Sequence, residues 1–256
     1  MSTPTIPILL YHAVAEHPPP GQAAFTVTPT AFGDHVRAIS AAGRTALTLR
    51  ELTAALRGER EMPERPVAVT FDDGFADTAN AVEQLLEAGL AASVFVTSGW
   101  IGRPGMLSAG AVRELASLGE RVEVGAHSVT HPRLDELAPA RAAVEIGDSK
   151  AAIEHVCGRS VSSFAYPHGA YDRHVRATTI AAGFSAAAAV KNALSHVDDD
   201  VHALARVTLA PQTTAAHVER LLAGNGAPRA WAHEHLRTRG YRSVRRLRRR
   251  LGRPVA

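Results

Sequence analysis

The sequence carries two adjacent carboxylates, Asp72 and Asp73, in the run Thr70-Phe-Asp-Asp-Gly74. Two neighbouring aspartates repel one another when both are ionised, and a structural role seldom requires both. A divalent metal ion resolves this conflict, because it can bind one carboxylate while the other stays free as a general base. A simple Asp-Gly turn that caps the next helix is the structural alternative.

A second motif places two histidines four residues apart, in the run His127-Ser-Val-Thr-His131-Pro132. Where the chain turns helically, residues at this spacing share a face, so both imidazoles can reach one ion. A pair of solvated loop histidines is the alternative. Two histidines and one carboxylate together form a site for zinc or a similar divalent ion, with positions left open for water and substrate.

Two further segments carry weaker signals. Pro167 and Gly169 flank His168 in the run Tyr166-Pro-His-Gly169, and such a bend can point a backbone N–H into a site, as an oxyanion donor requires. A plain turn explains this segment equally well. His12 follows the first apolar run of the chain, where a lone histidine more often has a structural role.

Short apolar runs alternate with segments whose apolar residues recur at a helical spacing. Repeated strand–helix units predict parallel strands with right-handed crossovers. About eight such strands would close a barrel, and an open doubly wound sheet is the alternative. In a barrel of this kind, functional residues gather at the carboxyl ends of the strands, where all four motifs lie. The candidate strands are Ile6–Tyr11, Thr45–Leu49, Val67–Phe71, Ser93–Thr97, Val122–Ala126, Ser163–Tyr166, Phe184–Val190 and Leu204–Thr208.

Helix boundaries are marked by residues with known end preferences. Thr28, Ser108 and Asp172 stand where the side chain can accept a hydrogen bond from the first turn of a helix. Glycine closes several predicted helices just before the next strand, because it adopts the left-handed conformation without steric cost. These glycines are Gly43, Gly89, Gly119, Gly158 and Gly183.

The bulk properties fit one large α/β domain. The chain has 256 residues, of which 46% are hydrophobic. Its single cysteine, Cys157, excludes an intrachain disulfide and gives no reason to expect an oxidising compartment. The N-terminus offers no secretion signal, and no apolar stretch approaches the roughly 20 residues that span a bilayer. We therefore predict a cytoplasmic protein.

The positive charge is concentrated at the C-terminus, where ten arginines and one acid lie between Arg229 and Arg253. We predict a barrel over residues 1–226 and a basic, helical tail over residues 227–256. A narrow apolar stripe in this tail suits an anionic membrane surface, which would place the protein at the inner face of the membrane, or an anionic polymer. A solvated tail is the alternative. Nucleic acid is disfavoured because few aromatic residues are interleaved with the charge. The stripe consists of Tyr241, Val244, Leu247 and Leu251.

In their order and spacing, the two metal-site motifs resemble those of the polysaccharide deacetylases with a NodB homology domain, also called carbohydrate esterase family 4. The resemblance covers roughly residues 6–222. It implies a distorted (β/α) barrel of about seven strands and one divalent metal ion, most often zinc, with cobalt or nickel as alternatives, that activates water against an N-acetyl group. Carried over residue by residue, it implies Asp72 as the general base and Asp73, His127 and His131 as the metal ligands.

The sequence departs from the family pattern at two points. Many members have an arginine ahead of the proline in the third motif, and this arginine orients the catalytic aspartate. The run Phe164-Ala-Tyr-Pro167 has none, so that support is missing or comes from elsewhere. Many members also have a late leucine–histidine motif that supplies the general acid, and residues 203–222 contain no clear one. His217 reads as part of an exposed helix.

One branch of the family deacetylates poly-N-acetylglucosamine and carries its acid in an early tyrosine–histidine motif. Tyr11-His12 is similar to that motif, and Tyr166-Pro-His-Gly169 is similar to the third motif of the same branch. The resemblance therefore implies His12 as the general acid, with a raised pKa that keeps it protonated. It also implies a substrate-binding and oxyanion segment formed by Tyr166, Pro167, His168 and Gly169.

From these residues we predict a metal-dependent hydrolase that removes acetyl groups from an N-acetylated carbohydrate, whether polysaccharide, glycolipid or amino-sugar conjugate. A related metal-dependent amidase or deformylase acting on a small metabolite is the first alternative, and the shape of the pocket would separate the two. An inactive barrel that binds glycans is the second alternative. The presence of both aspartates and both histidines disfavours it.

Overall fold

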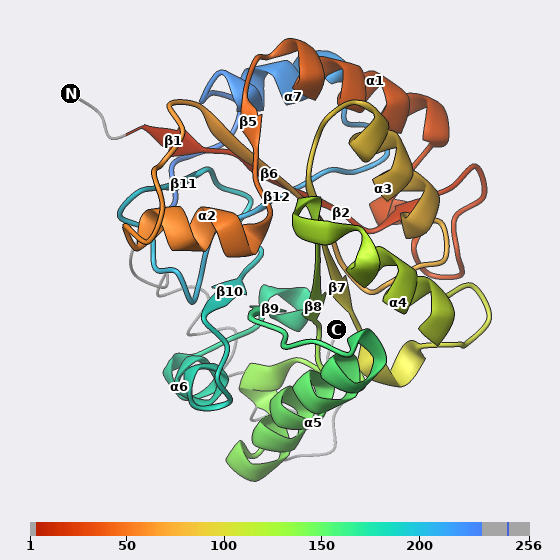
Figure 1. The fold of residues 1–256 in the computed structure, drawn as a ribbon, viewed down its shortest axis with the longest axis vertical. Helices are drawn as coiled ribbons and strands as arrows, with labels where there is room; N and C mark the ends of the chain where they lie inside the picture. Colours follow the sequence, from red (N-terminus) through yellow and green to blue (C-terminus); the bar gives the residue numbers. More distant parts are fainter. Residues whose placement is uncertain (1–3, 232–244, 246–256) are drawn as a thin grey trace.

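Seven parallel strands form one curved sheet around which the helices are arranged (Figure 1). The structure is a computed structural model that describes residues 4–231 and Arg245. A short strand, β5 (Thr45–Ala46), joins the side of the sheet next to β6. The order across the sheet is β10 (Ala186–Ala188), β9 (Ser163–Ala165), β8 (Val122–Ala126), β7 (Ala92–Val96), β6 (Pro66–Phe71), β2 (Ile8–Tyr11) and β12 (Val207–Thr208).

The two edges of this sheet meet through the segment that leads into β12. Ala188 of β10 forms a parallel bridge with Leu204. The backbone N–H of Ala189 donates to the Leu204 carbonyl at 2.8 Å, and the Leu204 N–H donates to the Ala187 carbonyl at 3.0 Å. These short contacts bend the sheet into a distorted barrel, so the predicted (β/α) barrel of about seven strands is confirmed.

Helices follow most strands and cover the outside of the sheet (Figure 1). The predicted starts are confirmed, because Thr28, Ser108 and Asp172 each accept a hydrogen bond from a backbone N–H in the first turn. The closing glycines adopt positive φ as predicted, for example 66° at Gly158. The helices are α1 (Pro29–Ala41), α2 (Leu49–Leu56), α3 (Thr78–Glu87), α4 (Ala109–Ser117), α5 (Pro139–Cys157), α6 (Arg173–Ala181) and α7 (Ala215–Leu222).

Several of the predicted strands are longer than the observed ones. In the run Thr45–Leu49, Thr48 caps α2 and forms a capping box with Glu51, so β5 ends at Ala46. The run Leu204–Thr208 contains only the two strand residues of β12. The run Phe184–Val190 contains only the three strand residues of β10. Two small pairs lie outside the barrel, namely β1 (Thr5–Ile6) with β11 (Ser195–His196) and β3 (Ala13–Val14) with β4 (Thr26–Val27).

The strands are apolar on both faces because both faces are buried. One hydrophobic cluster lies mainly between the sheet and its helices, and a second includes Ile8, Phe95 and Leu204 from the strands. Space beside Phe95 is so limited that a Cβ on Gly125 would lie 2.6 Å from its ring. The barrel is therefore a packed core that holds the strand ends in place, and the candidate functional side chains lie at one rim.

The chain stays with the barrel beyond residue 226. The Leu194 N–H donates to the Pro228 carbonyl, and the Ala230 N–H donates to the Leu194 carbonyl, both at 2.8 Å. Farther along, Arg245 forms an ion pair with Glu136, with 2.6 Å between Nε and Oε1. The rest of the predicted tail, including its helix and apolar stripe, lies outside the described residues. None of the helices that the structure describes has the length and apolar character needed to cross a membrane.

Candidate active site

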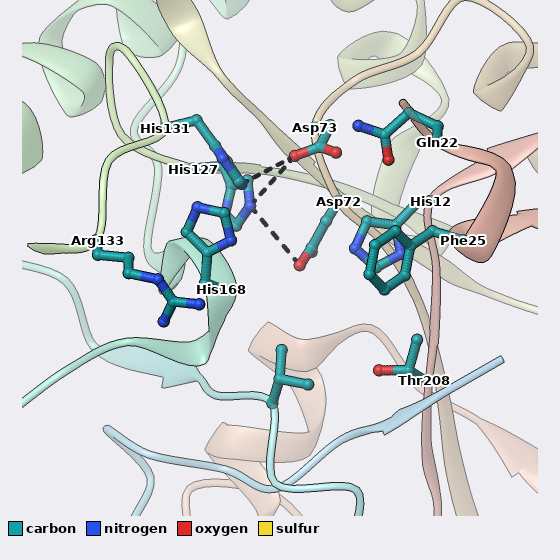
Figure 2. Close-up of a pocket in the computed structure, with 11 residues that line it drawn as sticks. His12, Gln22, Phe25, Asp72, Asp73, His127, His131, Arg133, His168 and Thr208 are labelled. Atoms are coloured by element: carbon teal, nitrogen blue, oxygen red, sulfur yellow. Dashed lines mark ion pairs between the residues drawn. The ribbon is translucent and has the colours of Figure 1, made fainter. Parts of the chain in front are cut away.

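The carboxyl ends of four strands bring the sequence motifs to one cavity of about 250 Å³ (Figure 2). Asp72 and Asp73 follow β6, His127 follows β8, His12 follows β2, and the segment around His168 follows β9. Parallel strands present their carboxyl ends on one rim, which explains why motifs far apart in the sequence meet. The cavity is lined by His12, Gln22, Phe25, Asp72, Asp73, His127, His131, Arg133, His168, Val190 and Thr208.

Three of these side chains converge as metal ligands would. The Asp73 Oδ1 atom lies 3.5 Å from His127 Nε2 and 3.2 Å from His131 Nε2. One potential ligand atom from each of the three residues lies within 4.8 Å of the other two. Ligands held about 2.0–2.2 Å from a tetrahedral ion are about 3.3–3.6 Å apart, so the two measured separations match such a site.

The chemistry of these atoms also fits a cation. Asp73 Oδ1 is buried without a hydrogen-bond donor, and burial followed by the charge of Asp72 raises the pKa of Asp73 to about 7. His127 Nδ1 lies 2.8 Å from the Ala165 carbonyl, which fixes the proton on Nδ1 and leaves the lone pair of Nε2 facing Asp73. Burial lowers the pKa of both histidines, that of His131 to about 2, so both are neutral as ligands must be.

The backbone of the site is held in an unusual conformation. Asp73, Ser128, His131 and His168 have φ angles of 73°, 63°, 60° and 58°, in the left-handed region that residues other than glycine seldom adopt. Within the described residues, the one other such position is Asn192. Conformations of this kind persist where the surrounding structure fixes them, and they gather at functional sites. The orientation of these four side chains therefore costs some of the free energy of folding.

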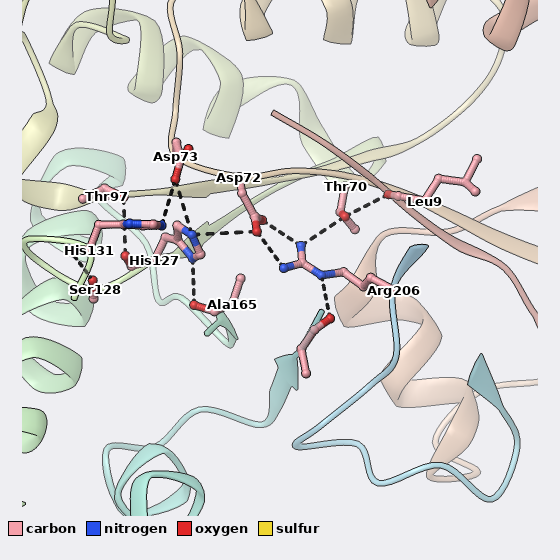
Figure 3. Close-up of polar contacts among 11 residues, drawn as sticks. Leu9, Thr70, Asp72, Asp73, Thr97, His127, Ser128, His131, Ala165 and Arg206 are labelled. Carbon is pink, nitrogen blue, oxygen red and sulfur yellow. Dashed lines mark hydrogen bonds and ion pairs between the residues drawn. The ribbon is translucent and has the colours of Figure 1, made fainter. Parts of the chain in front are cut away.

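Asp72 is oriented by a buried arginine, and its Oδ2 lies 3.7 Å from His127 Nε2 (Figure 3). The Arg206 guanidinium donates to both carboxylate oxygens of Asp72 at 2.7 Å and to the Thr70 hydroxyl at 3.2 Å. It also lies over the Phe95 ring, 5.6 Å from its centre. Burial raises the pKa of Asp72, but the charge and hydrogen bonds of Arg206 outweigh it and bring the pKa to about 2.

Arg206 is the functional residue that the sequence motifs did not reveal. Its two hydrogen bonds orient Asp72, the task for which the third motif offers no arginine, and it comes from the segment before β12, 134 positions after Asp72. The signal in the sequence was a single charge inside the apolar run Leu204–Thr208. Such a charge inside a predicted buried strand requires a buried partner of opposite sign.

His12 lines the same cavity, across Asp72 and Asp73 from the histidines at 127, 131 and 168 (Figure 2). Its ring packs 5.0 Å from that of Phe25, and its Nδ1 is buried without a hydrogen-bond partner in the described chain. The expected rise in its pKa is not observed. Burial lowers the pKa of His12 to about 4, because the Asp72 charge that opposes this effect is already paired with Arg206.

The segment from Tyr166 to Gly169 contributes to the cavity mainly through His168. The Tyr166 hydroxyl donates to the His202 carbonyl at 2.9 Å, and the Tyr166 side chain is not among those that line the cavity. The His168 ring lies edge-on to His131, with 4.5 Å between ring centres. The backbone N–H groups of Tyr166, Gly169 and Ala170 donate to backbone carbonyls, and Pro167 has none. His168 is the residue of this segment that lines the cavity.

His217 lies on α7, outside the residues that line the cavity. Its Nδ1 lies 3.1 Å from the Arg220 guanidinium. The late segment of the barrel instead contributes Arg206 and the cavity-lining Thr208. Within the described chain, the histidines at the cavity are therefore those at 12, 127, 131 and 168.

Comparison with known proteins agrees with this arrangement. The chain is 26% identical over 207 residues to YxkH of Bacillus subtilis, whose name assigns it provisionally to the polysaccharide deacetylases; the match covers 80% of this chain and 72% of that protein. Among solved structures, the Streptococcus pyogenes deacetylase PplD in complex with acetate superimposes with a TM-score of 0.76 at 23% identity, over 85% of this chain and 97% of that one. IcaB from Ammonifex degensii gives 0.72 at 22% identity, over 87% and 97%.

These structural likenesses show the fold. The sequence profile of the polysaccharide deacetylase family matches residues 59–187, which is half of the chain and includes the aspartate pair, both histidines of the second motif and the segment around His168. The chain belongs to the polysaccharide deacetylase family, and it is a deacetylase of acetylated sugars.

Proposed function

We propose that this protein is a metal-dependent hydrolase that removes the acetyl group from N-acetylated sugars. One observation carries the proposal. Asp73, His127 and His131 converge in the cavity, while both carboxylate oxygens of the neighbouring Asp72 accept hydrogen bonds from Arg206. An inactive glycan-binding barrel would require neither the ligand cluster nor a second, separately oriented carboxylate. Zinc fits the donor set best, and cobalt or nickel accept the same atoms.

Each residue then has a defined task. A divalent ion held by Asp73, His127 and His131 would polarise the amide carbonyl and lower the pKa of a bound water. Asp72 accepts the proton of the attacking water, and Arg206 fixes the direction of its oxygens. The backbone N–H of His168 donates to the oxyanion that forms on the former carbonyl oxygen. Tyr166, Pro167 and Gly169 hold His168 at this position.

His12 donates a proton to the departing amine, which is a poor leaving group as an anion. Because its pKa lies near 4, His12 is neutral in the free protein at pH 7. The proton that His12 donates would then be the one that Asp72 takes from the attacking water and passes on to His12 before the amine leaves. His12 would therefore not be a permanently protonated acid. It would donate only after Asp72 has accepted a proton in the same turnover.

The test of the proposed function is acetate release from N-acetylglucosamine, its oligomers, poly-N-acetylglucosamine and N-acetylated glycolipids, with an N-formyl sugar as the comparison for a deformylase. Protein stripped by a chelator should release no acetate, and one equivalent of zinc should restore the rate. Full activity after verified metal removal would contradict the metal role. Release from small formamides alone would favour the amidase alternative.

The acid role of His12 has its own test. His12→Ala should lower hydrolysis of the N-acetyl amide by roughly 10²-fold, as expected for lost acid catalysis. Hydrolysis of an activated aryl acetate should change far less, because its leaving group needs no proton. Equal losses on the two substrates would assign His12 to binding or structure instead.

Two predictions remain without support in the described residues. Association with an anionic membrane surface through the C-terminal tail concerns a segment of which only residues 227–231 and 245 are described. The cytoplasmic location rests on the sequence alone. Neither contributes to the proposed chemistry.

A further inference from the structure

The loop that joins His127 to His131 holds both histidines without the help of glycine. Ser128 and His131 adopt φ angles of 63° and 60°, in the left-handed region where residues other than glycine are strained. One local bond supports the turn, from the His131 N–H to the Ser128 hydroxyl at 3.0 Å. A strained loop with so little internal support requires a partner from another part of the chain.

The loop has partners on two sides. The backbone N–H groups of Ser98 and Gly99 donate to the Ser128 and Val129 carbonyls at 3.1 and 2.9 Å. The second partner is Glu145, which lies on α5 with 1% of its surface exposed and accepts the N–H groups of the loop. One carboxylate oxygen accepts the backbone N–H groups of Val129 at 3.0 Å and Thr130 at 2.8 Å. The other accepts the Thr130 hydroxyl at 2.7 Å and lies 3.1 Å from the Arg141 guanidinium. Three of these four contacts therefore reach the two residues that stand between Ser128 and His131.

We propose that Glu145 is a positioning residue that sets the metal affinity of the site. Its carboxylate holds two consecutive N–H groups, which fixes the strained turn and with it the direction of the His131 imidazole. The inference rests on the proposed function, since it assumes that Asp73, His127 and His131 bind the ion. Residues that orient metal ligands in this way typically change metal affinity by about 10–100-fold when replaced.

Glu145→Gln tests this, because its single carbonyl oxygen can accept either from the two backbone N–H groups or from the Thr130 hydroxyl, whereas the carboxylate accepts from both. The Kd for zinc, measured by competition with a chromophoric chelator, should rise about 10–100-fold. The absorption spectrum of the cobalt-loaded protein should also change, because the His131 ligand is less well oriented. Thr130→Val removes only the hydroxyl bond and should raise the Kd by several-fold, which covers the case of a poorly folding Glu145→Gln.

The matched control is Glu123→Gln, at the opposite end of β8. Glu123 is also buried, and it accepts the backbone N–H of Arg50 and the Ser93 hydroxyl at 2.8 and 2.9 Å. Its replacement should lower stability and leave the zinc Kd within about twofold of the wild type. A similar Kd shift in both variants, or none in folded Glu145→Gln, would overturn the inference. Wild-type protein that binds no divalent metal would instead refute the proposed function.

A separate observation concerns the charge of the cavity. Arg133 lines the cavity and follows directly after the second motif. The guanidinium of Arg133 lies near enough to His168 to contribute, after burial, to the lowered pKa of that residue. Of the cavity's two carboxylates, Asp72 is paired with Arg206 and Asp73 would be a ligand of the ion, and Arg133 forms no ion pair with any of the described residues.

From this unneutralised cation we infer that the cavity selects N-acetylated sugars that carry an anionic group, a carboxylate or a phosphate, next to the acetamide. The guanidinium fork matches both groups geometrically. This inference also rests on the proposed function. It names a class of substrate, and it does not alter the reaction.

The test compares matched substrates that differ in one charge. An oligomer of alternating N-acetylglucosamine and N-acetylmuramic acid, its carboxyl methyl ester, and a 3-phosphorylated N-acetylglucosamine oligomer separate carboxylate from phosphate recognition. Arg133→Gln should raise KM about tenfold for the preferred anionic substrate and change it less than twofold for the ester. Arg113→Gln, on the exposed face of α4, is the control.

Equal KM values for acid and ester in the wild type would contradict the inferred preference for anionic substrates. They would not contradict the proposed deacetylase function. Wild-type protein that deacetylates none of the three substrates would instead count against the proposed function.

Discussion

At the scale of single residues, the division of labour between Asp72 and Asp73 is set by their neighbours. Burial and the negative charge of Asp72 raise the pKa of Asp73, whereas Arg206 outweighs burial and keeps Asp72 ionised. Adjacent residues of identical chemistry thus enter the same cavity with pKa values of about 2 and about 7. Such a separation is how one site obtains two functions from two carboxylates.

Asp72→Asn should lower the turnover number by roughly 10²-fold or more, because it removes the proton acceptor and keeps the shape of the side chain. Metal content, measured by atomic emission, should stay near that of the wild type. If the variant loses its metal, the tasks of the two aspartates are reversed. A fully active variant would refute the base assignment.

Arg206→Lys should raise the pKa of Asp72, because an ammonium group cannot reproduce the two parallel hydrogen bonds of the guanidinium. The acidic limb of the profile of kcat/KM against pH should therefore move to higher pH. Arg206→Met leaves a buried carboxylate unpaired and should cost about 3–5 kcal/mol of stability in urea unfolding. Unchanged stability and pH profile in both variants would show that another group supports Asp72.

The histidines of the site predict how stability depends on pH. Burial lowers the pKa of His12 and His168 to about 4 and that of His131 to about 2, so the folded state binds fewer protons than the unfolded chain below pH 6.5. The raised pKa of Asp73, about 7, opposes this over the same range, but three histidines outweigh one carboxylate, so stability should fall as the pH drops from 7 toward 4. Urea midpoints of metal-free protein at pH 7.5, 6 and 5 measure this. His168→Asn should reduce the slope.

At the scale of elements, the turn after β9 depends on one glycine. Gly169 has a φ of 64°, and a Cβ there would lie 2.6 Å from the Val190 backbone nitrogen. Gly169→Ala should displace His168 and lower both stability and kcat/KM. Gly158→Ala is the control, since that position has a φ of 66° and no atom within 4 Å of the added Cβ. It should lower stability alone, and equal effects on activity would contradict the local explanation.

Strand ends and helix caps were predictable from the sequence because they depend on nearby residues. Thr28, Ser108 and Asp172 cap helices through bonds that span only three residues. The true end of β5 was also marked by a local signal, the capping box of Thr48 and Glu51. This capping box starts a helix inside a run whose apolar residues alone favour a strand. The short pairs β1–β11 and β3–β4 were not predictable, because two-residue strands leave almost no periodicity to detect.

At the scale of the whole molecule, the sequence indicated which residues gather at the rim and not how they are held there. Asp72, Asp73, His127 and His131 stand in motifs with fixed spacing, so they could be named. Arg206 and Glu145 act on them from distant parts of the chain, through contacts that exist only in the folded protein. Spacing along the chain carries no information on such pairs.

The boundary of the barrel gives a prediction at the same scale. Because Pro228 and Ala230 pair with Leu194, a chain ending at Trp231 should keep the fold, the metal affinity and the rate of acetate release from soluble oligomers. A chain ending at Gly226 should unfold at lower urea concentration, since it loses those two backbone bonds. Equal midpoints for the two truncations would show that residues 227–231 contribute nothing to the barrel.

The distance in sequence between Asp72 and Arg206 has a consequence for the newly made protein. A ribosome adds roughly 5–20 residues per second, so the aspartate leaves it on the order of ten seconds before its arginine. During that interval a nascent chain already carries both aspartates and both histidines of the second motif, yet no guanidinium is present to orient the carboxylate. We therefore expect hydrolytic competence to begin only after the last strand is synthesised, and fragments that end before Arg206 to be inert toward acetylated sugars.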